Sequence, residues 1–234
     1  MRVLIGCEFS GRTRDAFKAL GHEAYSCDLE ASEAGGNHIQ GDLLEIMNDG
    51  SWDLGIMHPP CTYLTVSGNP WLYHPDDKGL PKNQRRPHPR FPNRPQDRHN
   101  GIDFFMAVAN CKIPKLAIEN PVGIMSTLWR KPDQIIQPYQ FGDSFQKTTC
   151  LWLKNLPKLV PTNIVDRGEQ VTLKSGKVMA KWSAFAPVKD RVKIRNRTFP
   201  GIAAAFADQW GGDVNAEVAE EIDAIRKNAG LLLF

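Results

Sequence analysis

The first thirty residues carry the pattern that most constrains the fold of this chain. Apolar residues predict a buried strand at Arg2–Cys7, and Glu8–Gly11 follows as a turn. A helix is predicted from Arg14 to Leu20, and a second strand at Glu23–Cys27 leads directly to the acid Asp28. This order of strand, glycine turn, helix, strand and acid is typical of a nucleotide-binding α/β unit.

The turn and the acid have a physical use in such a unit. A glycine at position 11 lets a ligand approach the backbone amides at the helix start, and the Asp28 carboxylate can accept two hydrogen bonds from ribose hydroxyls. The pattern Gly-x-Gly-x-x-Gly is absent, so a cationic sulfonium nucleoside fits better than a dinucleotide. The alternative is that Gly11 only shapes a turn and Asp28 only caps a helix. Asp42, after Gly41, also has two interpretations. It could contact an adenine amino group, or it could only cap a helix.

A second feature is a thiol that directly follows a short apolar run. The run Asp53–Met57 ends in His58-Pro59-Pro60, and prolines cannot continue the interior of a strand, so Cys61 enters a loop. Open α/β folds keep their active sites at this carboxyl edge of the sheet. A cysteine is more often a small buried apolar residue than a nucleophile, and the two prolines are what distinguish Cys61.

A third apolar run, Lys115–Ile118, predicts a strand that leads to Glu119-Asn120-Pro121. Glu119 is therefore expected at the same edge as Cys61. The alternative interpretation is a helix cap or a salt-bridge partner.

The segment of about residues 68–100 interrupts the α/β rhythm with prolines and positive charges. We expect it to form no core and to be a mobile basic loop that contacts the phosphates of a nucleic acid, although charge runs usually form a plain solvated surface. Because the segment follows Cys61, its closure would carry the thiol with it. The candidate contacts in it are Lys78, Lys82, Arg85, Arg86, Arg90, Arg94 and Arg98.

The remainder of the chain predicts smaller elements within one domain spanning residues 1–234. Residues 171–179 indicate a hairpin around Ser175-Gly176, with Lys174 and Lys177 as further candidate nucleic-acid contacts. Residues 202–210 predict an amphipathic helix, and about 214–228 a terminal one.

Composition excludes several classes of protein. With 41% hydrophobic and 24% charged residues the chain is globular, and a net charge of +3 means that nucleic-acid binding needs local patches. The five cysteines contain no Cys-x-x-Cys pair, so neither a disulfide framework nor a metal site such as a zinc ribbon is suggested. The first apolar run stops at Glu8, and no run approaches about 20 apolar residues. We expect a cytoplasmic protein with no membrane partner.

Motifs spread along most of the chain occur in an order that resembles the DNA (cytosine-5) methyltransferases. They are Phe9-Ser10-Gly11, Asp28-Leu29, Gly41-Asp42, Pro59-Pro60-Cys61, Glu119-Asn120 and a stretch around Thr198 that runs from Arg197 to Ile202. The resemblance implies a Rossmann-like class I methyltransferase fold, a mostly parallel central sheet flanked by helices. It also implies S-adenosylmethionine as the cofactor and DNA as the partner. The implied cofactor contacts are Phe9, Ser10, Gly11, Asp28, Leu29, Asp42, Pro59 and Thr198.

The resemblance also implies roles for the cysteine and the glutamate. Carbon 5 of cytosine attacks a methyl donor only after a thiolate has added to carbon 6, which is the role implied for Cys61. Glu119 would share a proton with ring nitrogen 3. A duplex substrate would have to flip the cytosine out of its stack.

Three departures from the family pattern are visible. The arginines of a Gln-x-Arg-x-Arg motif are missing from Gln146–Cys150, so Lys147 or the basic segment would have to replace them. Pro121 stands after Asn120 where valine is more common. The region of about residues 155–195 is much shorter than a usual target-recognition domain, which predicts short or relaxed recognition, or a recognition partner. Small chains of this kind resemble phage or prophage enzymes, which act in the bacterial cytoplasm and relate to restriction–modification.

Three other functions remain open at this point. His58-Pro59-Pro60-Cys61 has the outline of the motif of enzymes that methylate exocyclic amines, although that motif needs an acid or amide first and an aromatic last. A second alternative is a DNA-binding relative without activity, and a third is an enzyme for free cytosine nucleotides. We expect a monomer, with a homodimer as the alternative.

Overall fold

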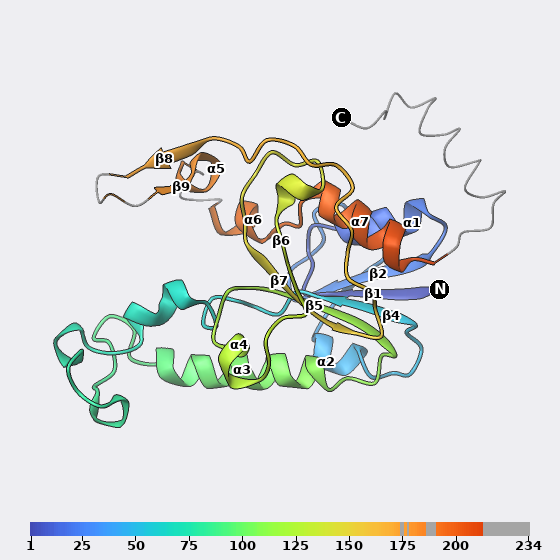
Figure 1. Ribbon diagram of the computed structural model, residues 1–234. Helices are drawn as coiled ribbons and strands as arrows, with labels where there is room; N and C mark the ends of the chain where they lie inside the picture. Colours follow the sequence, from blue (N-terminus) through green and yellow to red (C-terminus); the bar gives the residue numbers. More distant parts are fainter. Residues whose placement is uncertain (174–175, 177, 186–190, 213–234) are drawn as a thin grey trace.

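A seven-stranded, mostly parallel sheet forms the centre of the molecule in the computed structural model, which describes residues 1–173, 176, 178–185 and 191–212 (Figure 1). The strand order is β3-β2-β1-β4-β5-β7-β6. The first five strands of this order run parallel, and β7 is antiparallel to both of its neighbours. The strands are β1 (Arg2–Gly6), β2 (Glu23–Asp28), β3 (His38–Gln40), β4 (Leu54–Met57), β5 (Lys115–Pro121), β6 (Gln134–Ile136) and β7 (Thr149–Lys154).

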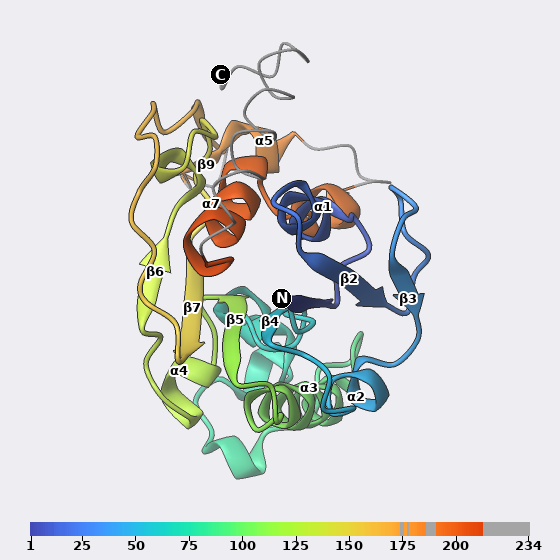
Figure 2. The same cartoon turned by 90° about the vertical axis from the view of Figure 1, so that its right-hand side faces the viewer.

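Helices cover both faces of the sheet, as Figure 2 shows. Successive side chains of a strand point to opposite faces of the sheet, so each strand contributes to the core on both faces. In β1, Val3 and Ile5 join one core cluster and Leu4 joins the other. One face is covered by α1 (Arg12–Ala19) and α7 (Pro200–Trp210). The other is covered by α2 (Leu43–Ile46), α3 (Arg94–Ala109) and α4 (Met125–Leu128).

This architecture confirms the predicted Rossmann-like class I methyltransferase fold. The predicted strands at the chain start and around residues 54 and 115 are present, and so are the helices in residues 14–20 and 202–210. Among the described residues, no helix is both long and apolar enough to cross a membrane.

The predicted loop of residues 68–100 is wrong at its end, because α3 begins at Arg94. Pro95 lies in the first turn of this helix, where the missing N–H would have no intrahelical partner. The proline therefore starts a helix here instead of excluding one.

Residues 66–93, which we call the arm, project from the sheet as an ordered segment (Figure 1). It contains the short 3₁₀ helices η1 (Val66–Trp71), η2 (Pro75–Asp77) and η3 (Lys82–Gln84). Leu72 and His88 are buried within the arm, but no residue of the arm belongs to either core cluster of the described chain, in keeping with the expectation that it forms no core. The buried carboxylate of Asp77 accepts hydrogen bonds from Arg86 Nη2 at 2.6 Å and Arg86 Nε at 3.0 Å. Whether the arm moves stays a prediction.

A second projection extends to the same side of the molecule as the arm (Figure 1). It consists of the antiparallel pair β8 (Gln170–Thr172) and β9 (Val178–Ala180), followed by α5 (Lys181–Ala184) and α6 (Arg191–Asn196). The pair matches the hairpin predicted for residues 171–179. Its predicted contacts Lys174 and Lys177 lie outside the described residues, as does the predicted helix at about 214–228.

Candidate active site

A cleft of about 950 Å³ lies at the carboxyl edge of the sheet. The strand order reverses between β1 and β4, and open α/β sheets bind ligands at this kind of switch point. The ends of β1, β2, β4 and β5 all contribute to the lining. From these ends the cleft is lined by Cys7, Phe9, Asp28, Glu30, His58, Pro59, Pro60, Cys61, Glu119, Asn120, Pro121 and Val122.

His58 and Glu119 form a hydrogen-bonded pair inside this cleft. The parallel register pairs Met57 of β4 with Ile118 of β5, so the next residue of each strand is a neighbour of the other. His58 Nδ1 lies 3.2 Å from Glu119 Oε2, with side chains only 11% and 17% exposed. The other ring nitrogen of His58, Nε2, is buried without a hydrogen-bond partner among the described residues.

Lys147 reaches the same pair because β7 is antiparallel. The amino end of β7 lies at the carboxyl edge of β5, where Thr149 pairs with Pro121. Lys147 precedes Thr149 by two residues and lines the cleft.

The ionisation of Glu119 reflects two opposing effects. Burial raises the pKa of its carboxyl group, while the charge of Lys147 and the hydrogen bond from His58 lower it, and the net pKa lies below the usual value. Glu119 is therefore a carboxylate at neutral pH until a bound group changes its surroundings.

The Cys61 thiol experiences the opposite balance. Burial and then the negative charge of Glu119 raise the pKa of Cys61, and the positive charges of Lys147 and Arg195 lower it only in part. The thiol is protonated at neutral pH in this state.

Two sets of contacts hold the loop that carries Cys61. Asn120, which is 2% exposed, donates from Nδ2 to the carbonyl oxygen of Pro59 at 2.7 Å. From the first turns of α3, Arg94 Nη2 donates to the Thr62 carbonyl at 2.9 Å and Arg98 Nε to the Tyr63 carbonyl at 2.8 Å. The loop is thus tied to β5 on one side and to α3 on the other.

Only some of the predicted cofactor contacts line the cleft. Phe9, Asp28 and Pro59 line the cleft. Asp42 caps α2 by accepting from Leu44 N at 2.9 Å, and Leu29 is 75% exposed.

The other three predicted cofactor contacts also lie outside the lining. Ser10 donates to the buried Glu8 carboxylate at 3.1 Å. Gly11 precedes α1 with φ of 74°. The carbonyl oxygen of Thr198 accepts from Arg12 at 2.9 Å. Their roles in binding a cofactor stay predictions.

Several predicted DNA contacts also hold the protein itself together. Arg94 and Arg98 bind the Cys61 loop, and Arg86 pairs with Asp77. Arg85 donates to the Leu80 carbonyl at 2.7 Å. Lys78, Lys82 and Arg90 are exposed cations of the arm, and the Arg90 guanidinium lies over the Phe91 ring at 5.3 Å.

Comparisons with known proteins give remote likenesses. No family model matches the chain, and no curated protein does. A solved structure described as a DNA modification methyltransferase encoded within an E. coli prophage is 13% identical, with a TM-score of 0.39 over 73% of this chain and 58% of that one. A mutant of Spodoptera frugiperda DNMT2 is 14% identical, with a TM-score of 0.40 over 71% of this chain and 54% of that one. S. pombe Dnmt2 is 12% identical, with a TM-score of 0.37 over 68% and 50%.

This chain therefore spans between half and three fifths of the length of each of these structures. Because all three TM-scores lie below 0.5, the function of this chain has to be inferred from its own residues.

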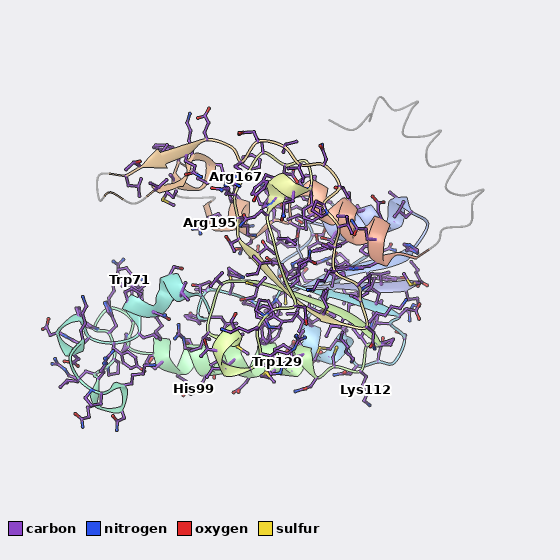
Figure 3. All side chains as sticks on the ribbon, in the orientation of Figure 1. Trp71, His99, Lys112, Trp129, Arg167 and Arg195 are labelled. Carbon is purple, nitrogen blue, oxygen red and sulfur yellow. The ribbon has the colours of Figure 1, made fainter. Side chains whose placement is uncertain are left out.

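Three cleft residues have no clear signal in the sequence. His58 is near Glu119 only through strand pairing, and Arg195 lies on α6, far along the chain. Trp71 of the arm also lines the cleft. Figure 3 shows Trp71 and Arg195 on the two projections.

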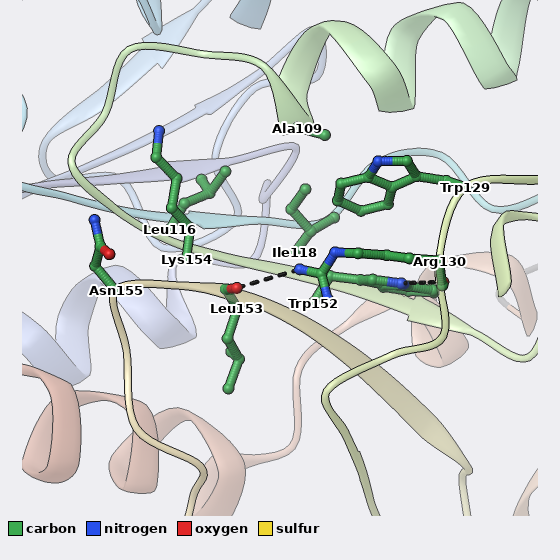
Figure 4. A pocket seen from close by; sticks show the side chains of 9 residues that line it. All are labelled: Ala109, Leu116, Ile118, Trp129, Arg130, Trp152, Leu153, Lys154 and Asn155. Carbon is green, nitrogen blue, oxygen red and sulfur yellow. Dashed lines mark hydrogen bonds between the residues drawn. The ribbon is translucent and has the colours of Figure 1, made fainter.

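A second hollow, of about 380 Å³, lies between the end of α3, α4 and the neighbouring strands β5 and β7 (Figure 4). Trp129 and Trp152 line it beside Arg130. The Arg130 guanidinium already donates to Asp133 at 2.7 Å and to the Leu153 carbonyl at 3.2 Å. Its charge is thus used within the fold, and we assign no ligand to this hollow.

Proposed function

We propose that this protein is an S-adenosylmethionine-dependent methyltransferase that modifies carbon 5 of cytosine in DNA. The observation that carries the proposal is that the Cys61 thiol and the Glu119 carboxylate line one cleft at the switch point of the sheet. A nucleophile and an acid that must act on neighbouring atoms of one ring need this kind of placement.

Cofactor binding fits the inner part of the same cleft. Phe9 lines the cleft with an aromatic ring, and Asp28 ends β2 with a carboxylate suited to ribose hydroxyls. S-adenosylmethionine, when bound, would supply an electrophilic methyl group.

Cys61 would act as nucleophile and later as leaving group. Its thiolate adds to carbon 6 of cytosine, which places electron density on carbon 5 for methylation. Loss of the carbon 5 proton then breaks the carbon–sulfur bond and returns the thiolate. The raised pKa of Cys61, caused mainly by burial, means that the thiol has to lose a proton before this step.

Glu119 would hold a proton against ring nitrogen 3 of the cytosine. Its lowered pKa in the present state reflects Lys147 and His58 acting against burial. A bound base would displace water, raise the proton affinity of the carboxylate and let it bind nitrogen 3 through that proton. Lys147 supplies a positive charge at this point, where the family pattern has arginines.

The test is a methylation assay with nucleoside analysis. The protein is incubated with S-adenosylmethionine and cytosine-containing DNA, and the digested DNA is analysed by mass spectrometry. The proposal predicts 5-methylcytosine, which Cys61→Ser abolishes. N4-methylcytosine or N6-methyladenine would contradict it in favour of amine methylation. No methylated base, with DNA still bound, would indicate a DNA-binding protein.

A further inference from the structure

The outer part of the cleft contains an aromatic wall that the proposed reaction does not use. Trp71, which ends η1, is 44% exposed and lines the cleft together with Phe91. The two rings make a T-shaped contact with centroids 5.6 Å apart, and Trp71 makes another with His88 at 5.3 Å. These contacts fix the plane of the indole while part of its surface stays accessible.

The position of this wall is coupled to the nucleophile loop. Arg98 donates from Nη2 to Asn69 Oδ1 at 2.6 Å within η1, and from Nε to the Tyr63 carbonyl at 2.8 Å. One guanidinium therefore connects the helix that presents Trp71 to the loop that presents Cys61. A ligand that lies against Trp71 and reaches Cys61 would meet two surfaces held in a fixed relation.

Positive charge accompanies the aromatic surface. Arg94, Lys147 and Arg195 all line the cleft. The facing projection contributes Met179 and Trp182 to the opposite wall. The acids of the same cleft, Asp28, Glu30 and Glu119, equal these cations in number and lie at the ends of β2 and β5. Cations beside exposed aromatic rings are an arrangement that binds single-stranded nucleic acid, because every unpaired base has a face that can stack.

We propose that Trp71 stacks on an unpaired base next to the one held by Cys61 and Glu119, so that the substrate is single-stranded DNA. This inference rests on the proposed function for the base at Cys61, but the stacking itself needs no cytosine. A duplex keeps its base faces covered by neighbouring bases, so an indole at the cleft wall can stack only where the strand is open.

The experiment measures binding of fluorescently labelled oligonucleotides of about 12 nucleotides, a length in the range of single-strand sites. The full chain is titrated against oligo(dT), against a mixed single strand and against the duplex of that strand. We expect the single strands to bind more tightly than the duplex. Trp71→Leu, which keeps an apolar side chain against His88 and Phe91, should weaken oligo(dT) binding by about 5- to 100-fold, the value of one stacked base.

Trp71→Phe and Phe185→Ala are the matched controls. Phenylalanine keeps a ring for stacking, so Trp71→Phe should retain most of the binding that Trp71→Leu loses. Phe185 is an aromatic residue that is 67% exposed and is not among the cleft-lining residues, so Phe185→Ala should bind as the wild type does. Thermal unfolding of each variant verifies that the fold is retained.

Equal binding of single strand and duplex, or wild-type binding by Trp71→Leu, would overturn the inference. So would equal losses in Trp71→Leu and Trp71→Phe. Since oligo(dT) contains no cytosine, these results are independent of Cys61 chemistry. If binding depends on Trp71 but no 5-methylcytosine forms, the proposed function is wrong and the stacking site stands. If 5-methylcytosine forms but binding does not depend on Trp71, the proposed function stands and the stacking site is wrong.

Discussion

At the scale of single residues, burial and then the charges at the cleft set the pKa of Cys61. The pKa of this thiol is raised by burial and by Glu119, and it is lowered in part by Lys147 and Arg195. Because the thiolate is the reactive form, the rate of Cys61 alkylation should rise with pH up to a midpoint above that of an ordinary cysteine, about 8.5.

Glu119→Gln removes a negative charge without changing the size of the side chain. We expect Cys61 to be alkylated several-fold faster in this variant near neutral pH, with the midpoint shifted to lower pH. Lys147→Met should have the opposite effect. Iodoacetamide labelling followed by peptide mass spectrometry resolves Cys61 from the other four cysteines. A midpoint in Glu119→Gln that is unchanged or higher would contradict this account of the cleft.

The limits of sequence interpretation are clearest at this scale. Cys61 and Glu119 could be selected because each follows a recognisable apolar run. The proximity of His58 to Glu119 depends on the register between β4 and β5. That of Lys147 depends on β7 running antiparallel, which a local pattern does not specify.

At the scale of elements, the arm is stabilised by an ion pair between the buried Asp77 carboxylate and the largely exposed Arg86 guanidinium. Hydrogen bonds from Arg86 lower the pKa of Asp77 to about 2, from a usual value of 3.8. A lowered carboxyl pKa means that the stabilisation is fully present above about pH 4 and is lost as the pH falls through 2. The arm should therefore keep this contact over the whole physiological range.

Asp77→Asn should open the arm without unfolding the sheet. The asparagine removes the charge that holds Arg86, so trypsin should cut at Lys78, Lys82 and Arg85 several-fold faster than in the wild type. Asp76→Asn is the matched control, because the Asp76 side chain is 80% exposed and lies next in sequence. If both variants are cut at the wild-type rate, the ion pair does not hold the arm.

The arm also shows why composition misleads for such segments. Its prolines and cations indicate a loop without a core, yet a single acid among them organises the backbone. In α3, apolar residues at helical spacing begin only after Gly101, whereas the preceding turns are polar and carry Pro95. Helix starts of this kind depend on tertiary contacts more than on periodicity.

At the scale of the whole molecule, late residues complete the core that the first strands begin. Phe206 of α7 is fully buried and belongs to the same cluster as Val3 and Ile5. Its ring stacks on Trp210 with centroids 4.8 Å apart. Folding of the sheet around β1 thus depends on a helix from the far end of the described chain.

Phe206→Ala should lower the free energy of unfolding by about 3–5 kcal/mol, the usual cost of removing a buried aromatic ring. Chemical denaturation with a single probe of the sheet, such as far-ultraviolet circular dichroism, measures this change. Leu128→Ala, at a position that is 57% exposed, should change it by less than about 0.5 kcal/mol. Similar values for the two variants would contradict the assignment of Phe206 to the shared core.

Much of the parallel sheet was accessible from sequence because β1, β4 and β5 are each short apolar runs followed by a turn or loop. The β8–β9 hairpin was predicted, but the antiparallel placement of β6 and β7 and the position of the second projection beside the cleft were not, since they depend on tertiary contacts rather than on local pattern. These same elements bring Lys147 and the wall facing Trp71 to the cleft.

The central claim is that Cys61 attacks cytosine, and covalent trapping tests it most directly. DNA containing 5-fluorocytosine is incubated with S-adenosylmethionine and the protein, because fluorine at carbon 5 blocks the elimination that would release the thiol. The account predicts a complex that survives denaturation with the wild-type protein and is absent with Cys61→Ser. No complex with the wild type on single-stranded or duplex DNA of mixed sequence, with S-adenosylmethionine binding confirmed, would contradict it.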